Sequence, residues 1–210
     1  MIIDAIVPAY NEERTIGNVI SVLKQVKEIN QIIVVNDHSK DATSYIAKQM
    51  GVIVVDLPNN IGKGGALKVG AEYSRGDYLL FIDADLIGLR PYHIKQILEP
   101  ILSKRAETTV GIFSSGRLST DLAQKITPFL SGQRVIKREL FQNIAALDES
   151  GYGVEIAITK HILKEKIPME EVYLDNLTHT MKEEKLGLLK GFAARMRMYW
   201  EIAKVLWDVR

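Results

Sequence analysis

The stretch LLFIDADLIGL, residues 79–89, runs from four apolar residues into Asp83-Ala84-Asp85 and then back into apolar sequence. It predicts a buried strand that ends at two carboxylates one residue apart. Ionised carboxylates this close repel each other, and partial burial raises the free-energy cost of that repulsion. The pair therefore indicates a compensating positive charge nearby, such as a cation held between the two side chains.

Similar apolar runs precede this stretch, and segments of helical period separate them. Because the runs are continuous rather than alternating in polarity, they predict parallel strands covered by helices on both faces. The predicted strands are 2–10 (broken at Pro8), 31–37, 52–58 and 77–83, and the predicted helices are 12–28, 39–50 and 63–74. Ligands of such sheets bind at the carboxyl ends of the strands. Polar residues expected along that edge are Asn11, Asp37, Asn59 and Asp83.

The second half of the chain is less regular. Strands are predicted within 109–115, 127–137 and 169–177, the last leading to Thr178-His179, and a helix is predicted from about Val154. Segment 187–207 carries apolar residues at helical spacing with basic residues between them, which predicts an amphipathic C-terminal helix. Since no repeat or linker interrupts the chain, we expect a single α/β domain over 1–210, with a nucleotide-type half at 1–110 and a more variable half at 111–210.

Composition excludes several classes of protein and site. The hydrophobic fraction of 47% and the charged fraction of 25% are those of an ordinary globular protein. A net charge of +1 gives no bulk attraction to nucleic acid, and the absence of cysteine removes disulfides and thiolate chemistry. The N-terminus has no basic segment, and no apolar run approaches the roughly 20 residues that span a bilayer. We therefore expect a cytoplasmic protein without a signal peptide.

The acids at 83 and 85 fit a metal site. Two carboxylates at this spacing can converge on one divalent cation, and their hard oxygens suit Mg²⁺ or Mn²⁺, which also bind phosphates. The alternative without a metal is that Asp83 caps a following helix while Asp85 is solvated. Segment 59–70, NNIGKGGALKVG, favours the metal because its glycines permit close backbone approach and Lys63 adds a positive charge at a helix N-terminus. The segment has neither the spacing of a P-loop nor the position of a dinucleotide fingerprint.

Four segments occur in an order and at a spacing that resemble a known family. They are VPAYNEERTIGNVI (7–20), IIVVNDHSKDAT (32–43), NIGKGGALKVGAEYSRGDYLLFIDADL (60–86) and SGQRVIKRELF (131–141). Together they look like family 2-type glycosyltransferases with the GT-A fold, a Rossmann-like, mostly parallel sheet flanked by helices. GYGVEIAI (151–158) and LTHTMKEEKLG (177–187) resemble the glucosyl-3-phosphoglycerate synthase group and its short bacterial relatives.

The resemblance implies a metal-dependent transfer of a sugar from a UDP- or GDP-linked donor to a hydroxyl or phosphate acceptor. Residues 1–110 would then bind the nucleotide sugar, and 111–210 would form the acceptor side. Asp37 would contact the base, Lys63 the base or diphosphate, and Asp83 the ribose and donor sugar. The donor-binding residues implied are Pro8, Ala9, Tyr10, Asn11, Glu12, Asp37, Gly62, Lys63, Asp83 and Ala84.

The resemblance also implies a metal and an acceptor side. Asp85 would be the main ligand of Mg²⁺ or Mn²⁺ and a catalytic residue, and His179 would complete the metal site. Glu155 would be the second catalytic residue, as the base of an inverting enzyme or as a group that orients acceptor or donor sugar in a retaining one. The acceptor-side residues implied are Arg117, Ser131, Gly132 and Gln133.

Alternative interpretations concern the class of protein and the acceptor. A sugar nucleotidyltransferase is disfavoured because residues 8–15, PAYNEERT, contain no glycine where that class has a glycine-rich loop. A non-catalytic nucleotide-sugar-binding module and a polyprenyl-phosphate sugar synthase stay open. In the second case the C-terminal helix would lie on the inner face of the membrane near a lipid phosphate; otherwise it would pack on the domain or on a partner subunit of a homodimer. A phosphorylated small molecule is the other acceptor class.

Overall fold

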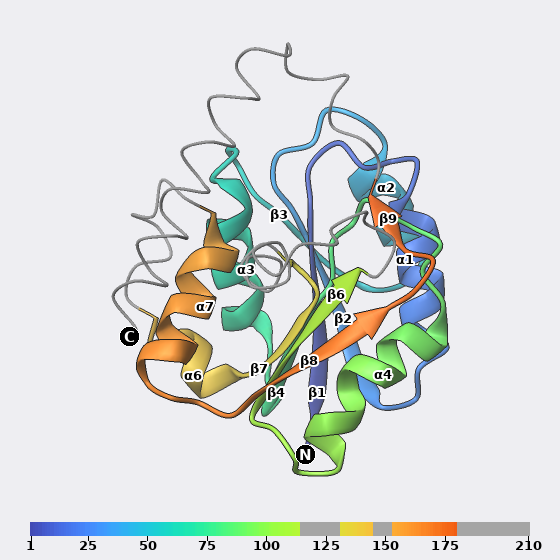
Figure 1. The fold of residues 1–210 in the computed structure, drawn as a ribbon. Coiled ribbons are helices and arrows are strands. Elements are labelled where there is room, and N and C mark those ends of the chain that lie inside the picture. The colour runs from blue at the N-terminus through green and yellow to red at the C-terminus, as the bar shows by residue number, and fades with distance from the viewer. Residues whose placement is uncertain (114–130, 145–152, 180–210) are drawn as a thin grey trace, which may run out of the picture.

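The computed structural model describes residues 1–113, 131–144 and 153–179 (Figure 1). A seven-stranded sheet, in the order β3-β2-β1-β4-β7-β6-β8, runs through these residues, and β5 and β9 form a separate two-stranded ladder. The strands are β1 Ile3–Ala9, β2 Ile29–Asn36, β3 Ile53–Asp56, β4 Tyr78–Phe81, β5 Leu86–Ile87, β6 Thr108–Phe113, β7 Arg134–Lys137, β8 Met169–Leu174 and β9 Thr178–His179.

The sheet is mostly parallel, as predicted. β1 runs parallel to β2 and β4, β2 to β3, and β6 to β8. β7 is the exception, since it runs antiparallel to both of its neighbours, β4 and β6. The start of β7 therefore lies beside the carboxyl end of β4, with Arg134 opposite Phe81. This reversal brings residues 131–134 to the edge at which ligands of parallel sheets bind.

Helices cover both faces of the sheet, so the domain has three layers (Figure 1). They are α1 Ile16–Leu23, α2 Thr43–Gln49, α3 Gly62–Tyr73, α4 Pro91–Leu102, α6 Arg138–Gln142 and α7 Val154–Lys164. α1, α2 and α4 share one buried apolar cluster with the sheet, and α3, α6 and α7 share the other. Successive residues of a strand point to opposite faces, so Ile6 packs in the second cluster and Val7 in the first.

The predicted break at Pro8 is wrong, because β1 continues through Pro8 to Ala9 and Pro8 lies opposite Val35 of β2. The backbone nitrogen of Pro8 points toward β4 rather than β2, as the backbone groups of Ile6 do. The carbonyl of Ile6 accepts the N–H of Ile82, just past β4. The pairing of β1 with β4 has ended by that point, at Ile6. The missing N–H of Pro8 therefore removes no hydrogen bond from the sheet.

Three helices differ most from the expectation, and one of them, α6, was not predicted. The predicted helix 12–28 is shorter, Ile16–Leu23, although its apolar stripe is buried as expected. α4 was not predicted, yet its signals are present: Pro91 occupies the first turn, and Ile94, Ile97, Leu98 and Ile101 are buried at helical spacing. The predicted C-terminal helix lies outside the described residues.

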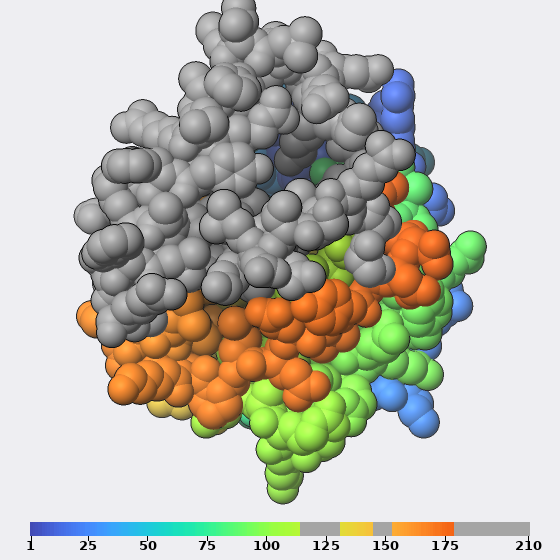
Figure 2. Space-filling view, viewed as in Figure 1, coloured from blue at the N-terminus to red at the C-terminus, as the bar shows by residue number. Residues whose placement is uncertain are grey.

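Strand β8 forms one edge of the sheet. Figure 2 shows β8 and α7 (orange) beside the α4–β6 part of the chain (green) on one surface of the molecule. Arg105 donates hydrogen bonds to Glu99 of α4 and Glu170 of β8 across this surface. Charged side chains on an edge strand oppose pairing with another chain. None of the helices that the structure describes is long and apolar enough to cross a membrane.

Candidate active site

The loops at the carboxyl ends of β1 and β2 are bonded to each other. The backbone N–H of Asn11 donates to Ser39 Oγ at 2.9 Å, and the side-chain Oδ1 of Asn11 accepts the backbone N–H of Lys40 at 2.8 Å. Asn11 has a φ of 56°, in the left-handed region that asparagine tolerates better than most residues. The N–H of Glu12 donates to Thr43 Oγ1 at 2.8 Å. These contacts fix the segment predicted to line the nucleoside pocket, where Tyr10 is 47% exposed.

Asp37 connects β2 to the start of α3. Its two carboxylate oxygens accept the backbone N–H groups of Ile61, at 2.8 Å, and Gly62, at 2.9 Å. The first N–H groups of a helix have no partner within the helix, so a carboxylate there is favourable. Gly62 has a φ of 78°, which explains the glycine. Asp37 is buried, and whether it also contacts a base stays a prediction.

Lys63 supplies a positive charge to the first of the paired acids, Asp83. Its Nζ forms ion pairs with Asp83 Oδ1 and, at 2.6 Å, with Glu155 Oε1. Asp83 and Glu155 are largely buried, with side chains 14% and 19% exposed, while Lys63 is 33% exposed. Three residues far apart in sequence, from the start of α3, the end of β4 and the start of α7, therefore form one charged cluster.

The cluster keeps Lys63 and Glu155 ionised at neutral pH. Burial opposes the charge of Lys63, but attraction to Asp83 and Glu155 outweighs it and raises the pKa of Lys63. Burial likewise acts to raise the pKa of Glu155, and the attraction of Lys63, with a smaller contribution from Arg134, lowers it instead. Glu155 is also the second residue of α7, where the helix dipole favours a carboxylate. The site therefore presents a carboxylate rather than a carboxylic acid.

The turn at 131–133 packs directly on this cluster. A Cβ atom on Gly132 would lie 2.5 Å from Lys63 Nζ and 2.7 Å from Asp83 Oδ1, so a larger residue would push the ion pair apart. Gln133 is fully buried, and its Nε2 donates to Asp83 Oδ2 at 3.0 Å. The hydroxyl of Ser131 bonds the carbonyl of Gly111. All three were predicted on the acceptor side; Gly132 and Gln133 support Asp83, and contact with an acceptor stays a prediction.

Asp85 and His179 come together through the small β5–β9 ladder. Leu86, directly after Asp85, is paired with His179, so the backbones of the two predicted metal ligands are neighbours. Asp85 is 6% exposed and Ala84 is 3% exposed. Gly88 has a φ of 83°, and a Cβ there would collide with the carbonyl of Asn176, which explains a glycine where the chain turns away from this ladder.

His93 anchors the segment that leads into β9. It is fully buried; its Nδ1 accepts the N–H of Arg90 at 3.0 Å, and its Nε2 lies 2.9 Å from the carbonyl oxygen of Asp175. An Nδ1 that accepts and an Nε2 that donates define the neutral imidazole with its proton on Nε2. His93 therefore connects the start of α4 to the chain four residues before His179.

The donor set at Asp85 suits a hard divalent cation. A buried carboxylate and an imidazole are acceptable ligands of Mn²⁺, and the carboxylate of Mg²⁺. Among the side chains that the structure describes, no three acidic or histidine groups converge on one point. The oxygens of a diphosphate are further ligands that such a cation accepts. Arg117, predicted to bind an anionic acceptor, lies outside the described residues.

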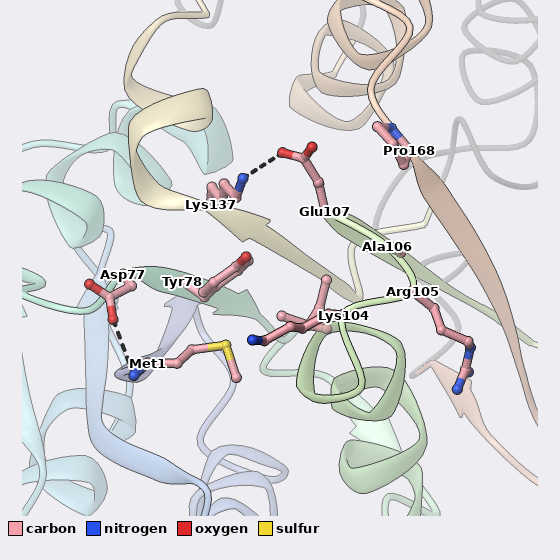
Figure 3. A pocket seen from close by; sticks show the side chains of 10 residues that line it. Met1, Asp77, Tyr78, Lys104, Arg105, Ala106, Glu107, Lys137 and Pro168 are labelled. Atoms are coloured by element: carbon pink, nitrogen blue, oxygen red, sulfur yellow. Dashed lines mark hydrogen bonds and ion pairs between the residues drawn. The ribbon is translucent and has the colours of Figure 1, made fainter.

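A cavity of about 510 Å³ lies at the opposite, amino-terminal end of the strands (Figure 3). Its lining includes Met1, Asp77, Lys104, Glu107 and Lys137. Several of its charges are paired within the protein: Lys137 with Glu107 at 2.5 Å, and the Met1 ammonium with Asp77 at 3.7 Å. It contains none of the residues predicted to bind donor, acceptor or metal. The candidate active site is the cluster around Lys63 at the carboxyl edge.

Fold and site together define a class of protein. A mostly parallel sheet in three layers, with a D-x-D pair after the fourth strand and a lysine bound to the first of these acids, is the GT-A arrangement. The model of glycosyl transferase family 2 matches residues 4–164, and the chain belongs to that family.

Curated relatives and solved structures agree with this assignment. The chain is 35% identical over 142 residues to dolichyl-phosphate beta-glucosyltransferase of Dictyostelium discoideum. This match covers 59% of this chain and 43% of the relative. It is 34% identical over 193 residues to glucosyl-3-phosphoglycerate synthase of Mycolicibacterium paratuberculosis, covering 74% of this chain and 58% of the relative. The matches thus span about half the length of these relatives.

The fold also matches the crystal structure of glucosyl-3-phosphoglycerate synthase from Mycobacterium tuberculosis in complex with Mn²⁺, UDP and phosphoglyceric acid. The TM-score is 0.79 at 25% identity, and the match covers 99% of this chain and 78% of that one. The same enzyme has been solved with Mg²⁺ and UDP, with a TM-score of 0.78 at 26% identity.

Proposed function

We propose that this protein is a metal-dependent glycosyltransferase that moves a sugar from a UDP- or GDP-linked donor to a hydroxyl or phosphate group of an acceptor. The observation that carries the proposal is the cluster of Asp83, Lys63 and Glu155 beside buried Asp85, at the edge where ligands of such sheets bind. Membership of glycosyl transferase family 2 supports it. So does the similarity to a synthase solved with Mn²⁺ and UDP.

The charges of the cluster suggest how each residue acts. Lys63, kept cationic by its two carboxylates, would stabilise the negative charge that develops on the departing nucleoside diphosphate. Asp85 and His179 would hold Mg²⁺ or Mn²⁺, which when bound supplies Lewis-acid stabilisation of phosphate oxygens. Glu155, kept as a carboxylate, can accept a hydrogen bond from an acceptor hydroxyl and so orient or deprotonate it. The donor would lie between segments 8–12, Asp37, 62–63 and 83–84.

The acceptor class that we favour is a phosphorylated small molecule. The synthase that matches almost the whole chain was solved with phosphoglyceric acid. A polyprenyl phosphate is the second candidate, favoured by the similarity to dolichyl-phosphate beta-glucosyltransferase over 142 residues. Peripheral membrane contact, a homodimer and a cytoplasmic location belong to this proposal as predictions, and the helix that would make the first contact lies outside the described residues.

Donor binding can be tested before the acceptor is known. Nucleotide sugars are screened for thermal stabilisation with and without Mn²⁺; a donor at about 100 times its Kd stabilises the folded state by about 2.7 kcal/mol. We expect a rise in Tm with one class of donor, and only with metal. No shift with any UDP- or GDP-sugar would contradict the proposal.

Turnover is then tested by the release of free nucleoside diphosphate. Asp85→Ala should keep the fold and lose the metal-dependent turnover. Asp77→Ala, at the opposite end of the sheet and 59% exposed, is the matched control and should keep it. Full activity of Asp85→Ala in the presence of a chelator would refute the assignment of the metal site.

A further inference from the structure

Arg134, at the start of β7, is the largest fully buried side chain that the structure describes. Its Nη2 donates a hydrogen bond to Thr159 Oγ1 at 2.7 Å. Burying a guanidinium is costly unless hydrogen bonds and negative charge compensate. Neither the predicted donor site nor the predicted acceptor side includes this residue, so its position needs an explanation.

Thr159 and Glu155 lie four residues apart on α7. Side chains at this spacing project from the same face of a helix, one turn apart. Arg134 thus lies under the face of α7 that carries Glu155. Burial lowers the pKa of Arg134 to about 10, and the negative charge of Glu155 acts in the opposite direction. At neutral pH the guanidinium is still charged, and it attracts the carboxylate from the side of the β7 strand.

Glu155 is therefore subject to two cations from two elements. Lys63, from α3, is in direct contact at 2.6 Å. Arg134, from β7, acts at longer range and through Thr159. The two contributions differ in one respect: Lys63 faces the donor site and would be drawn to a bound diphosphate, whereas Arg134 is buried beneath the helix. Only the charge of Arg134 would then stay in place when Lys63 is engaged by substrate.

We propose that Arg134 and Thr159 are positioning residues for Glu155, holding the first turns of α7 so that this carboxylate keeps its place while Lys63 binds the donor. The inference rests on the proposed function, because it takes Glu155 as the residue that contacts the acceptor. Arg134 and Thr159 touch no reacting atom; they act through Glu155.

The experiment compares Thr159→Val with Thr159→Ser and Thr109→Val. Thr159→Val removes the oxygen that accepts from Arg134 at nearly constant volume, and Thr159→Ser keeps it. Thr109 is equally buried, and its hydroxyl donates to the carbonyl of Ile97 at 2.9 Å, on the α4 side of the sheet. Thr109→Val therefore controls for the loss of a buried hydroxyl without a connection to Glu155.

With phosphoglyceric acid as the acceptor probe, we expect kcat/KM of Thr159→Val to fall about tenfold, as for the loss of one hydrogen bond to a charged group. The Kd for nucleoside diphosphate should stay unchanged, and the acidic limb of the pH–rate profile should move to higher pH. Thr159→Ser should stay within about threefold of the parent, as should Thr109→Val. Equal effects of Thr159→Val and Thr109→Val, or a parallel loss of donor binding, would overturn the inference.

A second measurement does not depend on turnover. The carboxyl carbon of Glu155, assigned by ¹³C NMR, is titrated in the parent, in Thr159→Val and in Arg134→Met, which removes the positive charge. We expect the titration of Glu155 to move to higher pH in both variants, and an unchanged midpoint would refute the role of Arg134. If the parent protein transfers no sugar from any donor, the proposed function fails, but this titration still decides whether Arg134 and Thr159 control Glu155.

Discussion

Replacing Lys63 by methionine tests the charge balance of the site without any substrate. Methionine keeps an unbranched side chain of similar length but leaves Asp83 and Glu155, 14% and 19% exposed, without their shared counter-ion. Removing one partner of a buried ion pair costs about 3–5 kcal/mol. Because Lys63 is itself 33% exposed, solvent screens part of this, and we expect a loss of about 2 kcal/mol at pH 8. For a chain of this size that lowers Tm by about 4–8 °C.

The loss should depend on pH in a direction that the site dictates. In the parent, the raised pKa of Lys63 contributes stability that is present below the pKa of an unfolded lysine and is lost as pH rises through the folded value. The lowered pKa of Glu155 contributes stability that is present above the pKa of an unfolded glutamate and is lost as pH falls through the folded value. Between pH 5 and 8 both contributions are constant. In Lys63→Met, burial without the lysine raises the pKa of Glu155, so the variant binds a proton more readily when folded and regains stability on acidification.

The assay is urea unfolding, followed by far-UV circular dichroism, at pH 5 and pH 8. We expect the deficit of Lys63→Met to be smaller at pH 5 than at pH 8, because the folded variant takes up a proton on Glu155 more readily than the unfolded chain does. The control is Lys48→Met, because Lys48 pairs with Asp56 at 2.5 Å on the surface, with side chains 54% and 41% exposed. That variant should lose less than about 1 kcal/mol. Equal losses in the two variants, or a Lys63→Met deficit that is the same at both pH values, would refute the reasoning.

Three further predictions follow from single contacts. Gly132→Ala should lower the initial rate at least about tenfold, because its Cβ would lie 2.5 Å from Lys63 Nζ, whereas Gly17→Ala, whose Cβ comes no closer than 3.5 Å to any side chain, should leave the rate unchanged. Burial lowers the pKa of His93, so its contribution to stability is present above about pH 6.5 and is lost as pH falls; the Tm of the parent should drop more steeply from pH 7.5 to 5 than that of His93→Gln, and parallel profiles would contradict this. Asp4→Ala should cost about 3–5 kcal/mol of unfolding free energy in urea titrations, since the buried carboxylate accepts five hydrogen bonds, and a loss below about 1 kcal/mol would show that water replaces them.

Continuous apolar strands made the first half of the fold predictable. Runs such as 31–37 and 77–83 have no polar face, so they must be buried on both sides, and this condition alone leads to a parallel sheet between two helix layers. The polar residue after each run then lies at one edge. The sequence thus indicated a basic residue, Lys63, in the segment before the strand that ends at Asp83, but their ion pair is a finding of the structure.

The supports of the site were not predictable in the same way. Gln133 precedes β7 and Arg134 begins it, and this strand runs antiparallel to its neighbours. Its direction depends on tertiary pairing rather than on its four residues. The proximity of Asp85 to His179 was predicted only through the family resemblance, since the β5–β9 ladder pairs residues more than ninety positions apart. Helix α4 is different, because it could have been predicted from Pro91 and from the helical spacing of the apolar residues that follow it.

The reversed direction of β7 also determines how this site tolerates insertions and deletions. Gln133 approaches Asp83 from the α4 side of the sheet, because a Cβ atom added to Gly111 would lie beside both the Cβ of Gln133 and Ile97 of α4. Arg134 points to Thr159 on the α7 side. Adjacent residues thus serve two different carboxylates by pointing in opposite directions. A one-residue slip of β7 would exchange the two faces, moving an amide toward the glutamate and a guanidinium toward the aspartate. A deletion at this turn that shifts β7 therefore disturbs both carboxylates at once, whereas a surface loop would absorb the same change in length.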